Sequence, residues 1–319
     1  MKQRRHFFTL LAIIVMTAVL FGCSTPGDSP AEKNSNIALP EQTGYPFTLI
    51  DDTGTSVVIP AKPARIVSLL PSSTEILSAL GQEPIAVTQW DDFPAGITER
   101  VEFVFQDALN PNLEQLVSLK PDLIMYWLTN EENTQKIRNL GVPVVVFDDK
   151  NIAETYETIA LMGGILARQE QADQLINRMK AKERDIDEKL AALPPTEKRS
   201  VWLEADDNLY TTGRGTFLDE LITRAGGLNI AGDAEGWVKF NSEQVIARDP
   251  DVILETYSYS DQKAIENIKN RRGWENIQAI RNNRVMSLDN SIISRQGPRI
   301  IDGLELVAKA IYPELFIEK

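Results

Sequence analysis

NLEQLVSLKPDLI at residues 112–124 and NSEQVIARDPDVI at residues 241–253 are two copies of one pattern, 129 residues apart. Six of the thirteen positions are identical, and most of the others are conservative. Each copy predicts an asparagine helix cap, a short helix, a Pro-Asp turn and a buried strand. One such unit is a common α/β connection. Two units in one chain indicate a duplicated architecture, with one copy in each of two related halves.

The chain around the first copy alternates between short apolar runs and helical patterns. It predicts strands at 65–70, 84–87, 122–125 and 142–147 and helices at 72–81, 113–119 and 134–140. The alternation resumes at 200–203 and continues towards the end of the chain. This order is typical of mainly parallel sheets covered by helices, so the sequence predicts the α/β class.

Local signals add two features to the first half. The runs FTLI and VVI flank the turn signal DDTG at 51–54 and predict a hairpin over 45–62. Ser72 with Glu75 fits a capping box that begins a helix, and Gly81 fits the end of that helix.

Residues 152–193 lack the strand pattern found on either side. Apart from one Gly-Gly pair they contain no helix breaker, and apolar residues recur near helical spacing among many charges. The pattern favours one long helix over 168–192, about 37 Å in length at 1.5 Å per residue. A pair of ordinary packing helices is the alternative. We therefore expect two α/β lobes, 45–151 and 194–319, joined by a single long helix.

The N-terminus has the pattern of an export signal. Residues 1–22 hold three basic residues and then a mostly apolar uncharged stretch that is short for a membrane span and right for a signal peptide. The stretch ends in LFGC, which resembles a lipoprotein signal with Cys23 as the acylated new N-terminus. A plain signal peptide is the alternative, but it leaves an odd free thiol. Residues 23–44 are rich in Ser, Pro, Gly and Asn and predict a flexible tether.

Composition excludes several kinds of chemistry. His6 is the only histidine and Cys23 the only cysteine in 319 residues. Once the signal is removed, a Ser-His-Asp triad, a Cys-His dyad and a zinc site of His or Cys are impossible, so we expect no catalytic residue, metal site or cofactor. The net charge of −13 becomes −16 without residues 1–22, which carry three basic residues and no acid. This balance argues against a nucleic-acid partner.

Glu114 and Glu243 occupy the same position in the two copies, at the start of a short helix. An acid there complements the helix dipole, which is one explanation of the pair. The other explanation is a two-point docking site, one acid on each lobe, for a partner with paired basic sockets.

Four aromatic residues follow or lie near the ends of predicted strands: Trp90, Trp127, Tyr210 and Trp237, the last in a predicted loop. In an open α/β sheet the loops beyond the carboxyl ends of the strands line the ligand crevice. Aromatic rings there offer flat apolar area to a ligand, although partial burial at a lobe edge explains any one of them equally well. Arg295 and Arg299, before the last helix, are candidates for holding an anionic or carbonyl-bearing ligand or for structural ion pairs.

These motifs, taken in order, resemble a known family. They are the lipoprotein signal, the tether, RIVSL at 65–69, PSSTE at 71–75, NLE at 112–114, KPDLI at 120–124, the long helix, GGLN at 226–229, NSEQ at 241–244 and GPR at 297–299. The set is similar to the substrate-binding proteins of ABC importers for cobalamin, iron–siderophores and haem, over nearly all of 45–319. The resemblance implies two Rossmann-like lobes with a ligand cleft between them. It also implies that Glu114 and Glu243 dock to arginines of the permease.

The resemblance is strongest to cobalamin-binding members. It implies ligand contacts by Trp90, Trp127, Tyr210 and Trp237, and it places Asp289 near the corrin. The hairpin is more typical of siderophore binders, and Arg295 suits an anionic ferric chelate, so ferric siderophores and haem stay as alternatives.

We expect a lipid-anchored, monomeric protein outside the cytoplasm. Its partners would be an ABC permease, the ATPase through that permease, and a metal complex that arrives already chelated. A surface hydrolase and a scaffold lipoprotein are the alternatives from other functional classes.

Overall fold

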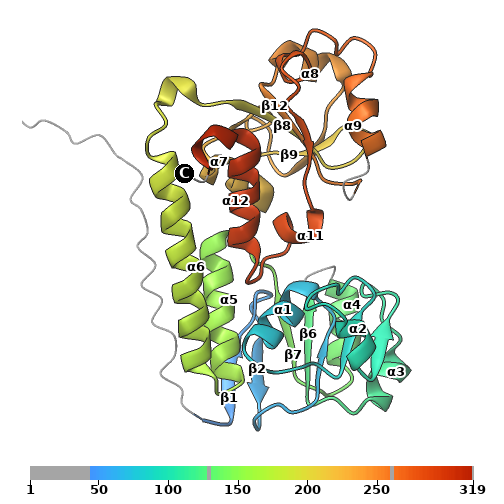
Figure 1. The fold of residues 1–319 in the computed structure, drawn as a ribbon. Helices are drawn as coiled ribbons and strands as arrows, with labels where there is room; N and C mark the ends of the chain where they lie inside the picture. The colour runs from blue at the N-terminus through green and yellow to red at the C-terminus, as the bar shows by residue number, and fades with distance from the viewer. Residues whose placement is uncertain (1–43, 128–130, 259–261, 318–319) are drawn as a thin grey trace, which may run out of the picture. The chain divides into compact units, whose positions relative to one another are not determined.

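The computed structural model describes residues 44–127, 131–258 and 262–317 (Figure 1). The predicted signal peptide, Cys23 and nearly all of the predicted tether lie outside the described residues. A search of the described part found no helix with the length and apolar character needed to cross a membrane.

The first half is built on a parallel sheet with the strand order β5-β4-β3-β6-β7. Its strands are β3 (Ile66–Ser68), β4 (Ala86–Thr88), β5 (Phe103–Phe105), β6 (Leu123–Trp127) and β7 (Val144–Phe147). The helices of this half are α1 (Pro71–Ala79), α2 (Ile97–Arg100), α3 (Leu113–Ser118) and α4 (Glu131–Arg138). Strands β3, β4 and β7, and β6 as far as Tyr126, are buried on both faces, which explains their continuous apolar runs. The predicted strands are confirmed, and β5 is an additional strand that the sequence pattern did not predict.

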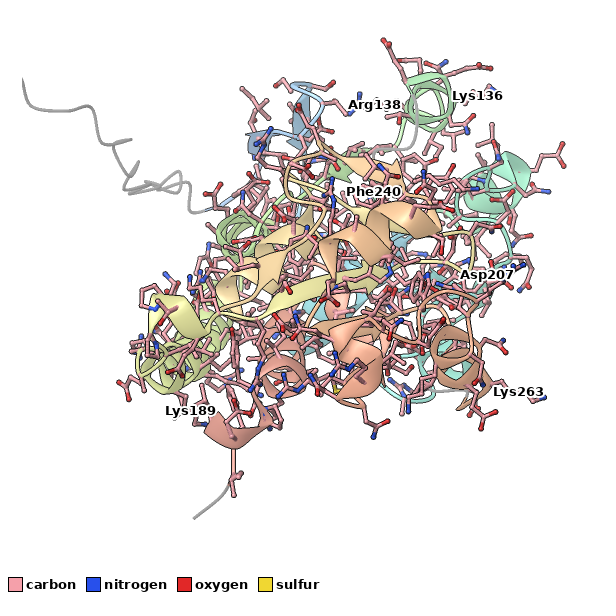
Figure 2. All side chains as sticks on the ribbon, turned by 90° about the horizontal axis from the view of Figure 1, so that it is seen from above. Lys136, Arg138, Lys189, Asp207, Phe240 and Lys263 are labelled. Carbon is pink, nitrogen blue, oxygen red and sulfur yellow. The ribbon has the colours of Figure 1, made fainter. Side chains whose placement is uncertain are left out.

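The predicted hairpin is present as β1 (Phe47–Ile50) and β2 (Ser56–Ile59), paired antiparallel. Asp51 in its turn is buried and accepts a hydrogen bond from Val146 N at 3.1 Å. Arg138 of α4 lies beside the hairpin and pairs with Asp51 at 2.5 Å (Figure 2). The turn is therefore attached to both β7 and α4.

Helix α1 corrects one local prediction. It begins with Pro71 at its first turn and Leu70 as its N-cap, and no side chain caps it. Ser72 and Glu75 lie inside the helix and are buried, so the predicted capping box is wrong. Proline at the first helical position suits the fixed φ of its ring. The predicted end is confirmed, since Gly81 follows the helix at φ +76°.

The linking region contains two helices, α5 (Ile152–Ile165) and α6 (Gln169–Leu190), which pack side by side (Figure 1). Helix α6 is the predicted long helix, but α5 packs beside it, so the linking region holds the pair of helices that the sequence analysis gave as the alternative to a single helix. A Cβ on Gly163 would lie 2.6 Å from Cβ of Ala172, so a glycine at this position permits the close contact. Further along, Lys182 of α6 pairs with Asp302 and Glu305 of the last helix at 2.6 Å each. Helix α6 thus contacts the second half of the chain as well.

The second half is built on a parallel sheet with the strand order β10-β8-β12-β13. Its strands are β8 (Ser200–Glu204), β10 (Leu228–Asn229), β12 (Val252–Glu255) and β13 (Val285–Ser287), and β9 (Tyr210–Thr212) with β11 (Trp237–Lys239) forms a separate antiparallel ribbon. Its helices are α7 (Phe217–Arg224), α8 (Ser242–Arg248), α9 (Gln262–Lys269), α10 (Gln278–Arg281), α11 (Asn290–Ile293) and α12 (Ile300–Ile311), with short 3₁₀ turns η1 (Pro195–Glu197) and η2 (Pro313–Leu315). The ribbon corrects the prediction that Trp237 lies in a loop.

The two sequence copies form the same structure, a capped helix followed by a buried strand. Asn112 and Asn241 each accept a hydrogen bond from the backbone N–H three residues later, as predicted. The aspartate of each Pro-Asp pair does more than make a turn. Asp122 accepts from the backbone N–H of Arg65, and Asp251 accepts from that of Ser200, so each carboxylate caps the start of the neighbouring strand.

Candidate ligand cavity and docking surface

A cavity of about 1160 Å³ is lined by residues from both halves of the chain. Its wall includes the segments that follow β3, β4, β5, β7 and β9 and the segment from Asn290 to Gln296. This is the edge at which an open α/β sheet binds its ligands. The cavity exceeds the roughly 300–1,000 Å³ typical of sites for drug-sized ligands, so it suits a larger molecule.

Three of the four predicted aromatic residues line this cavity. They are Trp90 and Trp127 from the first half and Trp237 from the second. Their exposed fractions are 59%, 45% and 59%, so much of each indole is available to a ligand. The structure therefore brings together indole rings from two lobes around one space.

A tight turn positions Trp90 after β4. Asp91 is buried and accepts hydrogen bonds from Thr88 N at 2.9 Å and from Thr88 Oγ1 at 2.6 Å. Trp90 N donates in turn to Thr88 Oγ1 at 3.2 Å. Burial raises the pKa of Asp91 above its usual value, and these hydrogen bonds oppose the shift. The turn holds the Trp90 backbone at the cavity edge.

Trp237 is held by the β9–β11 ribbon. It is paired with Thr212, and Gly213 N donates to Gly236 O at 2.8 Å just before the tryptophan. A Cβ on Gly213 would lie 2.7 Å from Ala234 O, so only glycine fits at this crossing.

Two predicted ligand residues lie outside the residues that line the cavity. Tyr210 is paired with Lys239 at the other end of the ribbon from Trp237, and the Lys239 ammonium lies 5.6 Å from its ring centroid. Asp289 caps α11 by accepting from Ser291 N at 2.8 Å, and the next residues, Asn290 and Ser291, line the cavity instead.

Arg295 lines the cavity, but its guanidinium is engaged by the first half of the chain. It pairs with Asp92, contacts Glu75 at 3.3 Å and donates to the carbonyl of Trp90 at 2.7 Å. Arg299 donates to the same buried Glu75 at 2.6 and 3.0 Å. The two arginines therefore form an ion-pair cluster between the halves, as expected if their role is structural and not ligand binding.

The remaining charges of the cavity wall are mostly acidic. Lys150, its other basic residue, pairs with Asp148 at 2.5 Å. Asp149 accepts from Thr158 Oγ1 at 2.7 Å, and burial raises its pKa to about 7. Asp107 accepts from two backbone N–H groups, those of Leu109 and Asn110. Each basic residue of the wall thus has an acidic partner, and two further carboxylates remain.

The sequence analysis did not single out Asp107, Asp148 or Asp149. All three lie just beyond the ends of strands β5 and β7, in segments that line the cavity. The tryptophans were predicted from their positions near the ends of parallel strands. The same criterion would have identified these three acids. A search for groups of three or more His, Cys, Asp and Glu side chains arranged for a metal ion found none in the part of the chain that the structure describes.

Glu114 and Glu243 lie in the first turns of α3 and α8, and both are exposed. They stand on different halves of the chain, outside the residues that line the cavity. Their positions leave both carboxylates accessible to a partner.

Comparisons with known proteins agree with this geometry. A family model described as "Periplasmic binding protein" matches residues 66–292. The chain is 33% identical to the uncharacterized ABC transporter substrate-binding lipoprotein YvrC of Bacillus subtilis, over the full length of both proteins. It is 28% identical to the vitamin B12-binding protein of Salmonella typhimurium, over 77% of this chain and 90% of that protein.

A solved structure gives the same fold. It is the crystal structure of a possible iron-binding (periplasmic solute-binding) protein from Staphylococcus epidermidis, with a TM-score of 0.69 and 33% sequence identity. The similarity covers 79% of this chain and 99% of that one.

Proposed function

Because the chain belongs to the periplasmic binding protein family and is the extracytoplasmic substrate-binding component of an ABC importer, we propose that its cavity captures a corrinoid and delivers it to the permease. The observation that carries the proposal is the wall of indole rings from both lobes around a space of about 1160 Å³. A corrin is a wide, flat macrocycle with an apolar body. Flat aromatic side chains on opposite walls match that shape and bury apolar area on binding.

The charges of the wall favour a corrinoid over an anionic chelate. Haem carries propionates, and many ferric siderophores carry net negative charge, so both need unpaired cations in the site. Arg295 and Lys150 each already pair with an acid of the protein. A neutral or cationic corrinoid meets no repulsion from Asp107 and Asp149.

A ferric siderophore is the second candidate, and two observations favour it. The β1–β2 hairpin is present, and the Staphylococcus epidermidis structure that is 33% identical is described as a possible iron-binding protein. In either case the metal arrives already chelated, because the chain after Cys23 has no histidine or cysteine to offer it.

The ligand is identified by calorimetry on the mature protein with cyanocobalamin, a panel of ferric siderophores and haemin. We expect cyanocobalamin to bind, and at 100 times its dissociation constant to stabilise the fold by about 2.7 kcal/mol. Binding of a siderophore or haemin without any response to a corrinoid would refute the leading assignment. Turnover of an ester or glycoside would revive the hydrolase alternative, and the absence of any stabilising ligand would favour a scaffold.

We also propose that Glu114 and Glu243 dock the loaded protein onto paired basic residues of the permease, and that acylated Cys23 anchors the monomer to the membrane. The glutamates are exposed and occupy equivalent positions in the two lobes. Replacing both with glutamine should abolish transport and leave ligand affinity unchanged. Normal uptake by the double variant would contradict docking through these residues.

A further inference from the structure

Two exposed apolar side chains occupy the helices that carry these glutamates. Val117 on α3 and Ile246 on α8 have exposed fractions of 53% and 37%. Across residues 44–127, 131–258 and 262–317, they are the only large hydrophobic residues on helices that are exposed to this extent. They are also the same position of the repeat, 129 residues apart.

Neither side chain belongs to the buried core of its lobe, although Ile246 Cδ1 also lies close to Gly273. The residue before each one, Leu116 or Val245, is fully buried and provides the inward contact of its helix. Valine and isoleucine are β-branched and lower helix propensity, so the stability of these short helices does not explain them. A solvent-facing helical position normally carries a polar side chain. Single exposed apolar residues are common on proteins, but a matched pair on equivalent helices is a shared property of the two lobes.

Each apolar residue lies beside the glutamate of its helix. Glu114 precedes Val117 by three residues, and Glu243 precedes Ile246 by three, a spacing that places side chains on one helix face about 5–6 Å apart at Cβ. The next residue is small in both copies, Ser118 or Ala247, and exposed. Each lobe therefore presents one acidic group and one aliphatic group together, and the small residue beside them lets a partner surface approach closely.

We infer that Val117 and Ile246 are docking contacts, each covering the ion pair that its neighbouring glutamate makes with the permease. The inference rests on the proposed function. It specifies the partner surface as a basic side chain next to an apolar depression, present twice. An aliphatic contact beside a charge pair excludes water and strengthens the pair, as the residues around an interface hot spot do.

The test measures binding of the mature protein to the cognate permease–ATPase complex in nanodiscs. The double variant Val117→Thr with Ile246→Thr keeps the β-branched shape and makes both side chains polar. We expect it to bind the permease about tenfold more weakly, with each single change contributing about threefold. Its affinity for cyanocobalamin and its melting temperature should equal those of the wild type.

The matched control is Ile50→Thr with Val58→Thr, which changes two exposed β-branched residues of the hairpin. It should dock normally. Docking of the Val117/Ile246 variant within twofold of wild type would overturn the inference, as would an equal loss in the hairpin control.

The proposed function is tested separately by the Glu114→Gln with Glu243→Gln variant and by cyanocobalamin binding. Loss of docking in the glutamate variant, with normal docking in the Val117/Ile246 variant, would leave the proposed function standing and remove only this inference.

Discussion

Replacing Glu75 with glutamine should loosen the contact between the two halves of the chain. The Glu75 side chain is 1% exposed and is held by Arg299 Nη2 at 2.6 Å, Arg299 Nε at 3.0 Å and Arg295 Nη1 at 3.3 Å. Glutamine keeps the volume and one acceptor oxygen, but it removes the charge and turns an amide N–H₂ towards a guanidinium. Two arginines then lose their buried counter-ion.

The size of the effect follows from burial. Removing one partner of a buried ion pair costs about 3–5 kcal/mol. The two arginine side chains keep 15% and 17% of their surface exposed, and Asp92 still lies near both, so we expect the lower end, about 3 kcal/mol. The matched control is Asp92→Asn. Asp92 contacts the same arginines with a 56% exposed side chain, so its loss should cost less than about 1 kcal/mol.

Urea unfolding at neutral pH measures both variants, with the free energy obtained by linear extrapolation. Hydrogen exchange is the second measurement, and we expect faster exchange at residues 88–92 and 294–299 in Glu75→Gln. A Glu75→Gln protein within 1 kcal/mol of wild type would refute the reasoning. An Asp92→Asn variant that costs as much as Glu75→Gln would refute it equally.

Three further predictions concern the cavity and the anchor. Trp237→Ala should weaken corrinoid binding about tenfold in calorimetry. If the ligand covers about 60 Å² of the indole, the loss at 25 cal/mol/Å² is about 1.5 kcal/mol. The control Tyr210→Ala should bind the corrinoid with normal affinity. Burial raises the pKa of Asp149 to about 7, so between about pH 4 and 7 the folded state holds a proton that the unfolded chain has lost. Stability should therefore fall as pH rises through that window, by at most about 1.4 kcal/mol per pH unit, and denaturation of Asp149→Asn should show a flatter profile; identical profiles would contradict this. Cys23→Ala should release the protein from membranes on fractionation, and continued membrane association would rule out the lipid anchor.

Much of the fold could be predicted from the sequence because its signals are local. The asparagine caps of α3 and α8 accept hydrogen bonds from the backbone N–H three residues later, and four adjacent residues form the hairpin turn. The buried parallel strands show as continuous apolar runs. Where the local signal was ambiguous, tertiary packing decided the structure. Ser72 and Glu75 match a capping box, yet the helix begins at Pro71. The Glu75 side chain is buried and accepts hydrogen bonds from Arg299.

The candidate site could be predicted only in part. The rule that ligand-binding residues lie near the carboxyl ends of parallel strands correctly placed Trp90 and Trp127 at the cavity edge. It could not separate Trp237 from Tyr210, because the β9–β11 ribbon puts them at opposite ends of one paired element.

By itself, the sequence determined the duplicated α/β plan, the position of the long helix and the two equivalent glutamates, because each is signalled by short runs of adjacent residues that can be recognised wherever they occur in the chain. Only the tertiary structure decided what Arg295 does. Arg295 contacts Glu75, which is 220 residues away in the sequence. Whether its guanidinium faces a ligand or a buried carboxylate depends on which distant residues the fold places beside it. The exposure of Val117 and Ile246 was settled the same way. Which side of a short helix faces solvent depends on the sheet against which it packs.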